Sequence, residues 1–224
     1  MPKRVAHPET SPAPSLIDFA AAALRAESPV FTRRNLYFAV RRSQAGGVTE
    51  LAFDATLRRV LSRGTVPGLL AEPSARRSPR LPKGWDAVAP RAVLLVDRPV
   101  VRDLLRATEA IAKAGVAVVC VDGTPSPVVA WLTRELDAGL RAPVLYLHDA
   151  ATVLYPFTIE PLASLVRHRD GRPIVYRDLG LPPLGATARR FADPSLLGDE
   201  PILELEAIPP ATLARYVEQA AFSS

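Results

Sequence analysis

The sequence predicts a mixed α/β protein, with a helical amino-terminal part followed by a part built around a parallel sheet. Residues 16–64 show helical patterns of apolar residues, whereas residues 91–149 alternate short apolar runs with helical patterns. Such alternation is typical of strand–helix–strand units with parallel strands. Of the 224 residues, 48% are apolar and 23% are charged. This composition supports a hydrophobic core and excludes a largely disordered chain.

The amino-terminal part is expected to form successive short helices. The first covers residues 16–25, the second covers residues 33–42 with Thr32 as its N-cap, and the third covers residues 50–64. The apolar residues of the third helix share one face: Phe53, Leu57, Val60 and Leu61. Its arginines lie away from that face: Arg58, Arg59 and Arg63.

The segment that follows, residues 65–85, is rich in proline, glycine and arginine, which is typical of a loop rather than of a packed element. Its basic residues are Arg76, Arg77, Arg80 and Lys83. Helices joined by a turn and followed by a basic loop are the outline of a winged helix-turn-helix. We therefore expect a winged helix-turn-helix domain over residues 15–84, preceded by a flexible tail over residues 1–14.

Basic charge is concentrated in this part of the chain. Residues 1–91 contain 15 Lys and Arg against 7 Asp and Glu, a net charge of +8, whereas residues 92–224 contain 13 against 16, a net charge of −3. A basic part of this kind favours a polyanionic partner, with DNA or RNA ahead of lipid. The arginines expected to contact phosphates lie on the second and third helices or directly after them: Arg33, Arg34, Arg41, Arg42, Arg58, Arg59 and Arg63.

The second part, residues 90–224, is expected to be a parallel α/β domain. Buried strands are predicted over residues 91–97, 116–123 and 142–149, with a further strand within 171–180. Helices are predicted over residues 100–115, 127–139 and 209–221. The only cysteine, Cys120, lies inside the second of these strands, so neither an internal disulfide nor a cysteine-based zinc site is expected.

An acidic residue ends each of the first strands of this part: Asp97, Asp122 and Asp149. In open parallel sheets, ligands bind outside the carboxyl ends of the strands. Carboxylates gathered there repel one another unless a cation lies among them, and a hard cation such as Mg²⁺ prefers oxygen ligands. The alternative is that these acids only cap the following helices or keep a loop soluble.

Five sequence segments, in chain order, resemble the A subunit of topoisomerase VI and its meiotic double-strand-break relatives. They span roughly residues 31–215 and read FTRRNLYFAVRR, LLVDRP, VVCVDGTPSPVVAWLTREL, PVLYLHDAA and LELEAIPP. The resemblance implies a winged-helix domain that carries a tyrosine nucleophile and a Toprim domain that holds Mg²⁺. It also implies a homodimer on double-stranded DNA and a separate ATPase chain as partner.

The residues of this sequence depart from the family pattern at both reactive positions. The family helix reads Arg-Asp-Ile-aromatic-Tyr, and the matching run, residues 34–38, places Phe38 where the family has its nucleophile. Adjacent helix residues point about 100° apart, so Tyr37 is a candidate nucleophile only after a local change of register. Among the Toprim acids, Asp97 and Asp149 remain as candidate ligands for a weak Mg²⁺ site, whereas Ala151 replaces the last aspartate.

The sequence therefore predicts a DNA-binding protein that resembles the topoisomerase VI A subunit and whose DNA cleavage is lost or weakened. Two alternatives stay open: an active Mg²⁺-dependent topoisomerase or nuclease, and a non-catalytic module that binds another protein. No apolar run approaches the ~18 residues that a membrane span needs. Residues 1–15 lack the apolar stretch of a secretory signal, so a cytoplasmic protein without membrane contact is expected.

Overall fold

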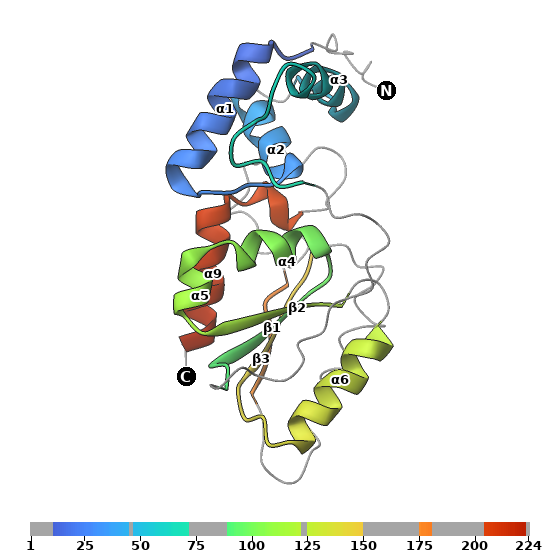
Figure 1. The fold of residues 1–224 in the computed structure, drawn as a ribbon, viewed down its shortest axis with the longest axis vertical. Coiled ribbons are helices and arrows are strands. Elements are labelled where there is room, and N and C mark those ends of the chain that lie inside the picture. The colour runs from blue at the N-terminus through green and yellow to red at the C-terminus, as the bar shows by residue number, and fades with distance from the viewer. Residues whose placement is uncertain are drawn as a thin grey trace, which may run out of the picture.

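The computed structural model describes residues 11–44, 47–71, 89–121, 125–149, 175–180 and 204–222. Within these ranges, helices α1–α3 form one end of the molecule, and a parallel sheet with helices on both faces forms the rest (Figure 1). The α/β class predicted from the sequence is therefore confirmed. Among the described helices, none is long and apolar enough to span a membrane.

The helical end consists of α1 (Pro14–Glu27), α2 (Arg33–Ser43) and α3 (Glu50–Leu61). The predicted cap of α2 is present, because Thr32 Oγ1 accepts a hydrogen bond from the Asn35 backbone N–H at 3.0 Å. The Asn35 side chain in turn accepts the Thr32 backbone N–H at 2.9 Å. This reciprocal capping box fixes where α2 begins, and therefore fixes the direction of the arginines in its first turn.

After α3 the chain returns to the start of α2. The Phe31 backbone N–H donates to the Gly68 carbonyl, and the Leu70 backbone N–H donates to the Phe31 carbonyl, each at 2.9 Å. Gly68 has a φ of 85°, a conformation that glycine adopts without strain. The basic residues of the expected wing lie outside the described residues: Arg76, Arg77, Arg80 and Lys83.

The sheet has four parallel strands in the order β2-β1-β3-β4. They are β1 (Ala92–Val96), β2 (Val116–Cys120), β3 (Val144–Leu147) and β4 (Tyr176–Asp178). The fourth strand predicted within residues 171–180 is thus present over a short span. Because β2 and β3 lie on opposite sides of β1, the chain leaves β1 toward one side of the sheet and returns to β3 on the other side. The carboxyl ends of β1 and β3 therefore form a topological switch point, where open α/β sheets bind ligands.

Helices cover both faces of the sheet. On one face, Leu94 and Val96 belong to the same buried cluster as residues of α4 (Pro99–Arg106), α5 (Glu109–Lys113) and α9 (Pro210–Phe222). On the other face, Val93 and Leu95 pack with Trp131 of α6 (Pro125–Asp137). All five residues of β1 are buried, as the uninterrupted apolar run of that strand predicts.

The helix predicted over residues 100–115 is divided in two. Thr108 has an extended backbone with φ −92° and ψ 120°, which ends α4 at Arg106 and allows α5 to begin at Glu109. The Thr108 side chain donates to the Leu104 carbonyl at 3.0 Å. This local bond satisfies a carbonyl near the end of α4, where helices leave their last carbonyls unpaired.

The helical end packs directly on the α/β part. Helix α9 contacts α1 as well as α4 and α5, and Figure 1 shows it beside α4 and α5, with one end toward the helical end of the molecule. Ile17 of α1, Leu36 of α2 and Leu213 of α9 lie in one continuous buried cluster with residues of the sheet. A short 3-10 helix, η2 (Leu205–Ala207), lies against α2 at this junction.

Candidate functional site

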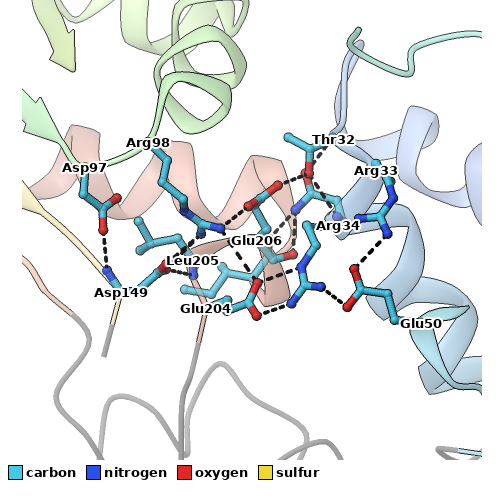
Figure 2. Close-up of polar contacts among 12 residues, drawn as sticks. Thr32, Arg33, Arg34, Glu50, Asp97, Arg98, Asp149, Glu204, Leu205 and Glu206 are labelled. Atoms are coloured by element: carbon cyan, nitrogen blue, oxygen red, sulfur yellow. Dashed lines mark hydrogen bonds and ion pairs between the residues drawn. The ribbon is translucent and has the colours of Figure 1, made fainter. Parts of the chain in front are cut away.

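The two acids predicted as metal ligands lie together at the switch point of the sheet. Asp97 follows β1 directly, and Asp149 follows β3 after a single intervening residue. The backbone N–H of Asp149 is 3.4 Å from Oδ2 of Asp97, to which it donates (Figure 2). Asp97 and Asp149 therefore lie close together at one edge of the sheet. Asp122, the third predicted acid, lies outside the described residues.

A cation from the protein itself lies against Asp149. Arg98 is the N-cap of α4, between Asp97 and Pro99, so the connection from strand to helix directs its side chain to this edge. Its Nη2 is 2.9 and 3.0 Å from the two carboxylate oxygens of Asp149. Its Nη1 is 2.7 Å from Oε2 of Glu206. One guanidinium therefore joins the end of β3 to η2 (Figure 2).

Asp149 is held by the backbone as well. The Leu205 backbone N–H donates to its Oδ1 at 2.6 Å. Burial raises the pKa of Asp149 to about 6, with the negative charge of Asp97 adding to this effect and the positive charge of Arg98 opposing it. Burial and ion pairing thus shift the pKa of the Asp149 carboxyl in opposite directions.

Glu206 is the most deeply buried acid of the site, with 1% of its surface exposed. Its Oε1 accepts a hydrogen bond from the Thr32 hydroxyl at 2.5 Å, and its backbone carbonyl accepts one from the Asn35 side chain at 2.7 Å. Burial raises the pKa of Glu206, and the charge of Arg98 opposes that shift. Thr32 and Asn35, which form the capping box of α2, therefore also bind η2 through hydrogen bonds to Glu206.

The ion pairs continue into the helical end. Arg34 Nε donates to Glu204 Oε2 at 2.8 Å, and its Nη2 forms an ion pair with the other carboxylate oxygen. The Nη1 of Arg34 is 2.5 Å from Glu50 on α3. Glu50 also accepts a bond from Arg33 at 2.8 Å, and Arg33 pairs with Asp54. We call this connected set the junction network: Arg33, Arg34, Glu50, Asp54, Arg98, Asp149, Glu204 and Glu206.

The arginines predicted to bind DNA fall into two groups. In the first, Arg33 and Arg34 pair within the junction network, and Arg42 donates to the Ala207 carbonyl at 3.1 Å. Arg41 lies 3.5 Å from the Tyr37 hydroxyl. The second group is exposed and has no carboxylate partner in the part of the chain that the structure describes: Arg58, Arg59 and Arg63.

The candidate nucleophile Tyr37 lies in the core. Its side chain is 6% exposed, and its hydroxyl donates to the Val48 carbonyl at 3.4 Å. Its ring contacts Phe38 and Phe53, with ring centroids 5.2 and 5.4 Å away. Phe38, at the nucleophile position of the family that the sequence resembles, is buried too. In this conformation the packed rings keep a DNA phosphate away from the Tyr37 hydroxyl.

The side chains as placed do not fit a Mg²⁺ ion. Within the described ranges, no group of at least three His, Cys, Asp or Glu is arranged to hold a metal. Both carboxylate oxygens of Asp149 face the guanidinium of Arg98, and one also accepts the Leu205 N–H. Mg²⁺ needs oxygens free to point at it in near-octahedral geometry. Ala151 lies outside the described residues.

Five residues of the junction network were missed in the sequence: Glu50, Asp54, Arg98, Glu204 and Glu206. Arg98 directly follows the acid at the end of a strand, a position from which a side chain can reach the same edge. The two glutamates alternate with apolar residues in the segment LELEAIPP, a spacing that favours a shared direction. Both segments contribute to the resemblance noted above, but nothing in either indicates that their charges pair with one another.

Comparison of the chain with family models, with curated proteins and with solved structures finds no match.

Proposed function

We propose that the protein binds double-stranded DNA through the exposed arginines at the end of α3, and that it lacks DNA cleavage through Tyr37. One observation carries this proposal. Arg58, Arg59 and Arg63 are exposed without a described carboxylate partner, whereas Arg33 and Arg34 of the same basic part are neutralised. The guanidinium groups left in solvent are those that can exchange water and counterions for phosphates.

The charge distribution supports the same partner. Residues 1–91 have a net charge of +8 by count, which favours a polyanionic partner for this part of the chain. Arginine binds phosphate through two parallel N–H···O bonds, which makes it suited to a DNA backbone. Contacts of this kind supply affinity and orientation but read no base sequence. We therefore propose salt-dependent binding with little sequence preference.

The absence of cleavage through Tyr37 is supported by its burial. Attack on a phosphodiester needs the nucleophilic oxygen about 3 Å from phosphorus and in line with the leaving oxygen. The Tyr37 hydroxyl instead donates to the Val48 carbonyl, and the Tyr37 ring packs against Phe38 and Phe53. Of the two carboxylates predicted to hold a metal, that of Asp149 is engaged by Arg98.

The test is a titration of a fluorescently labelled DNA duplex followed by anisotropy. The variant Arg58→Glu/Arg59→Glu/Arg63→Glu is expected to lose affinity by roughly tenfold or more, and its salt dependence should become shallower. The control is Lys113→Glu/Arg134→Glu/Arg215→Glu, which changes the net charge equally at exposed positions of α5, α6 and α9. The DNA affinity of this control should stay within about threefold of the wild type, because salt screens charges that lie far from the binding surface.

Two results would contradict DNA binding at this surface. One is a wild-type affinity that does not change with salt, and the other is an equal loss in both triple variants. Cleavage is tested separately by incubating supercoiled plasmid with the protein and Mg²⁺. The plasmid is expected to remain supercoiled. Nicked, linear or relaxed products, together with a protein–DNA adduct abolished by Tyr37→Phe, would restore the enzyme alternative.

A further inference from the structure

We propose that the guanidinium of Arg98 is the resident cation of the sheet edge and replaces the divalent metal that the sequence resemblance implies. This inference is independent of DNA binding, because it concerns how the acid after β3 and the glutamates at η2 are neutralised. It also assigns to Arg98 a role that no segment of the sequence indicates.

The contacts of Arg98 are those of a cation shared among several carboxylates. It pairs with Asp149 through Nη2 and with Glu206 through Nη1, at distances of 2.7 to 3.0 Å. Glu204 lies 3.8 Å from the same Nη1. These acids come from two separate segments, the end of β3 and η2, and the guanidinium lies between them (Figure 2).

Burial explains why a cation is required there. Glu206 is almost fully buried and Asp149 is 14% exposed at its side chain. A buried carboxylate without a positive partner is costly, since it loses the hydration of its charged form. Arg98 supplies that partner at a fixed place, because it is the N-cap of α4 and is followed by Pro99. A divalent ion entering the cluster would have to displace the guanidinium or lie against its positive charge.

Neutralisation by the Arg98 guanidinium and neutralisation by a divalent metal predict different results when Arg98 is replaced. In Arg98→Met the carboxylates of Asp149 and Glu206 lose their shared cation, and together with the nearby Asp97 they become oxygen ligands open to a metal. We therefore expect this variant to gain a divalent-cation response that the wild type lacks. The control is Arg102→Met, which removes one positive charge from the next turn of α4, where Arg102 pairs with Asp103 outside the cluster.

The experiment uses the full chain stripped of metal. Melting temperatures are measured in MgCl₂ and in NaCl of equal ionic strength, and direct binding is followed by the electron paramagnetic resonance signal of Mn²⁺. For Arg98→Met, Tm is expected to rise by roughly 3 °C or more when Mg²⁺ is at about ten times its Kd. The wild type and Arg102→Met should melt at the same temperature in both salts and should leave the Mn²⁺ signal unchanged.

Each alternative outcome overturns the proposal. A wild-type Tm that rises specifically with Mg²⁺, or wild-type binding of Mn²⁺, would show that a metal coexists with Arg98. A folded Arg98→Met without any metal response would show that the acids are not competent ligands. If Arg98→Met does not fold without metal, Mg²⁺ during refolding should restore its far-ultraviolet circular dichroism, and failure to do so rejects the inference.

Discussion

The arginines at the start of α2 and those at the end of α3 belong to the same basic part of the chain, yet their surroundings are opposite. Arg33 and Arg34 pair with Glu50, Asp54 and Glu204 from two other segments. The exposed group meets no carboxylate in the described part of the chain: Arg58, Arg59 and Arg63. Both groups count equally in the net charge of the sequence.

The comparison shows that the number of basic residues overstates the positive charge offered to a partner. A paired guanidinium already donates its N–H groups to carboxylates of the same molecule, and a phosphate would have to displace them. At an exposed arginine, a phosphate displaces only water and counterions. Paired arginines should therefore contribute to stability, and exposed arginines should contribute to binding.

The largest expected effect is a loss of stability when a paired arginine is removed. Arg34→Met leaves Glu50 and Glu204 without their shared partner at a half-buried place. We expect the free energy of unfolding to fall by about 2 kcal/mol, less than for a fully buried pair because water reaches part of the guanidinium. Urea unfolding measures this as a lower midpoint with an unchanged slope.

The matched control is Arg59→Met on α3, where the same substitution removes an exposed arginine. Its free energy of unfolding should change by no more than about 0.5 kcal/mol, while its affinity for duplex DNA should decrease. Arg34→Met should show the reverse, with affinity close to that of the wild type. If both variants lose equal stability, the distinction between the two groups of arginines is wrong.

A smaller effect on stability is expected at the His148–Asp178 pair, because the imidazole loses its charge as the pH rises. His148, just after β3, is 3.0 Å from Asp178 through Nε2 and 2.7 Å from the Asp149 carbonyl through Nδ1. Burial lowers the pKa of His148, but the bonds to these acceptors prevail and the pKa is raised overall. Because the folded state binds the proton more tightly, this contribution to stability is complete below about pH 6.5 and is lost as the pH rises through the raised pKa.

The measurement is the free energy of unfolding at a series of pH values from 6 upward. Relative to the wild type, Asp178→Asn is expected to show a shallower decline, by about 1 kcal/mol or less over the range. The reason is that an amide no longer favours the charged imidazole. Parallel pH profiles for the two proteins would mean that the His148–Asp178 pair does not titrate within this range.

Much of the fold could be predicted because its signals are local. The apolar runs of β1 and β3 indicate buried parallel strands, and their last residues bring Asp97 and Asp149 to one edge. Thr32 was identifiable as a cap from its position alone. The division of the helix at Thr108 was not predicted, because the apolar spacing continues across the break and only the backbone shows it.

The pairing within the site could not be predicted in the same way. Arg34 and Glu204 are 170 residues apart in sequence, and their contact depends on how η2 packs against α2. The sequence pattern of an amphipathic helix is the same whether its arginine faces solvent or a carboxylate from a distant segment. The position of Arg98 among the acids likewise follows from tertiary packing, which no local pattern encodes.

The smallest expected effect is that of Tyr37→Phe. The substitution removes one long hydrogen bond, 3.4 Å from hydroxyl to the Val48 carbonyl, and leaves the ring contacts with Phe38 and Phe53 in place. The free energy of unfolding should change by about 0.5 kcal/mol or less, and the affinity for duplex DNA should be unchanged. Urea unfolding and anisotropy titration test both statements. A clear loss of DNA affinity would mean that the Tyr37 hydroxyl leaves the core to meet a phosphate, and that the paired end of α2, rather than the exposed end of α3, faces the DNA.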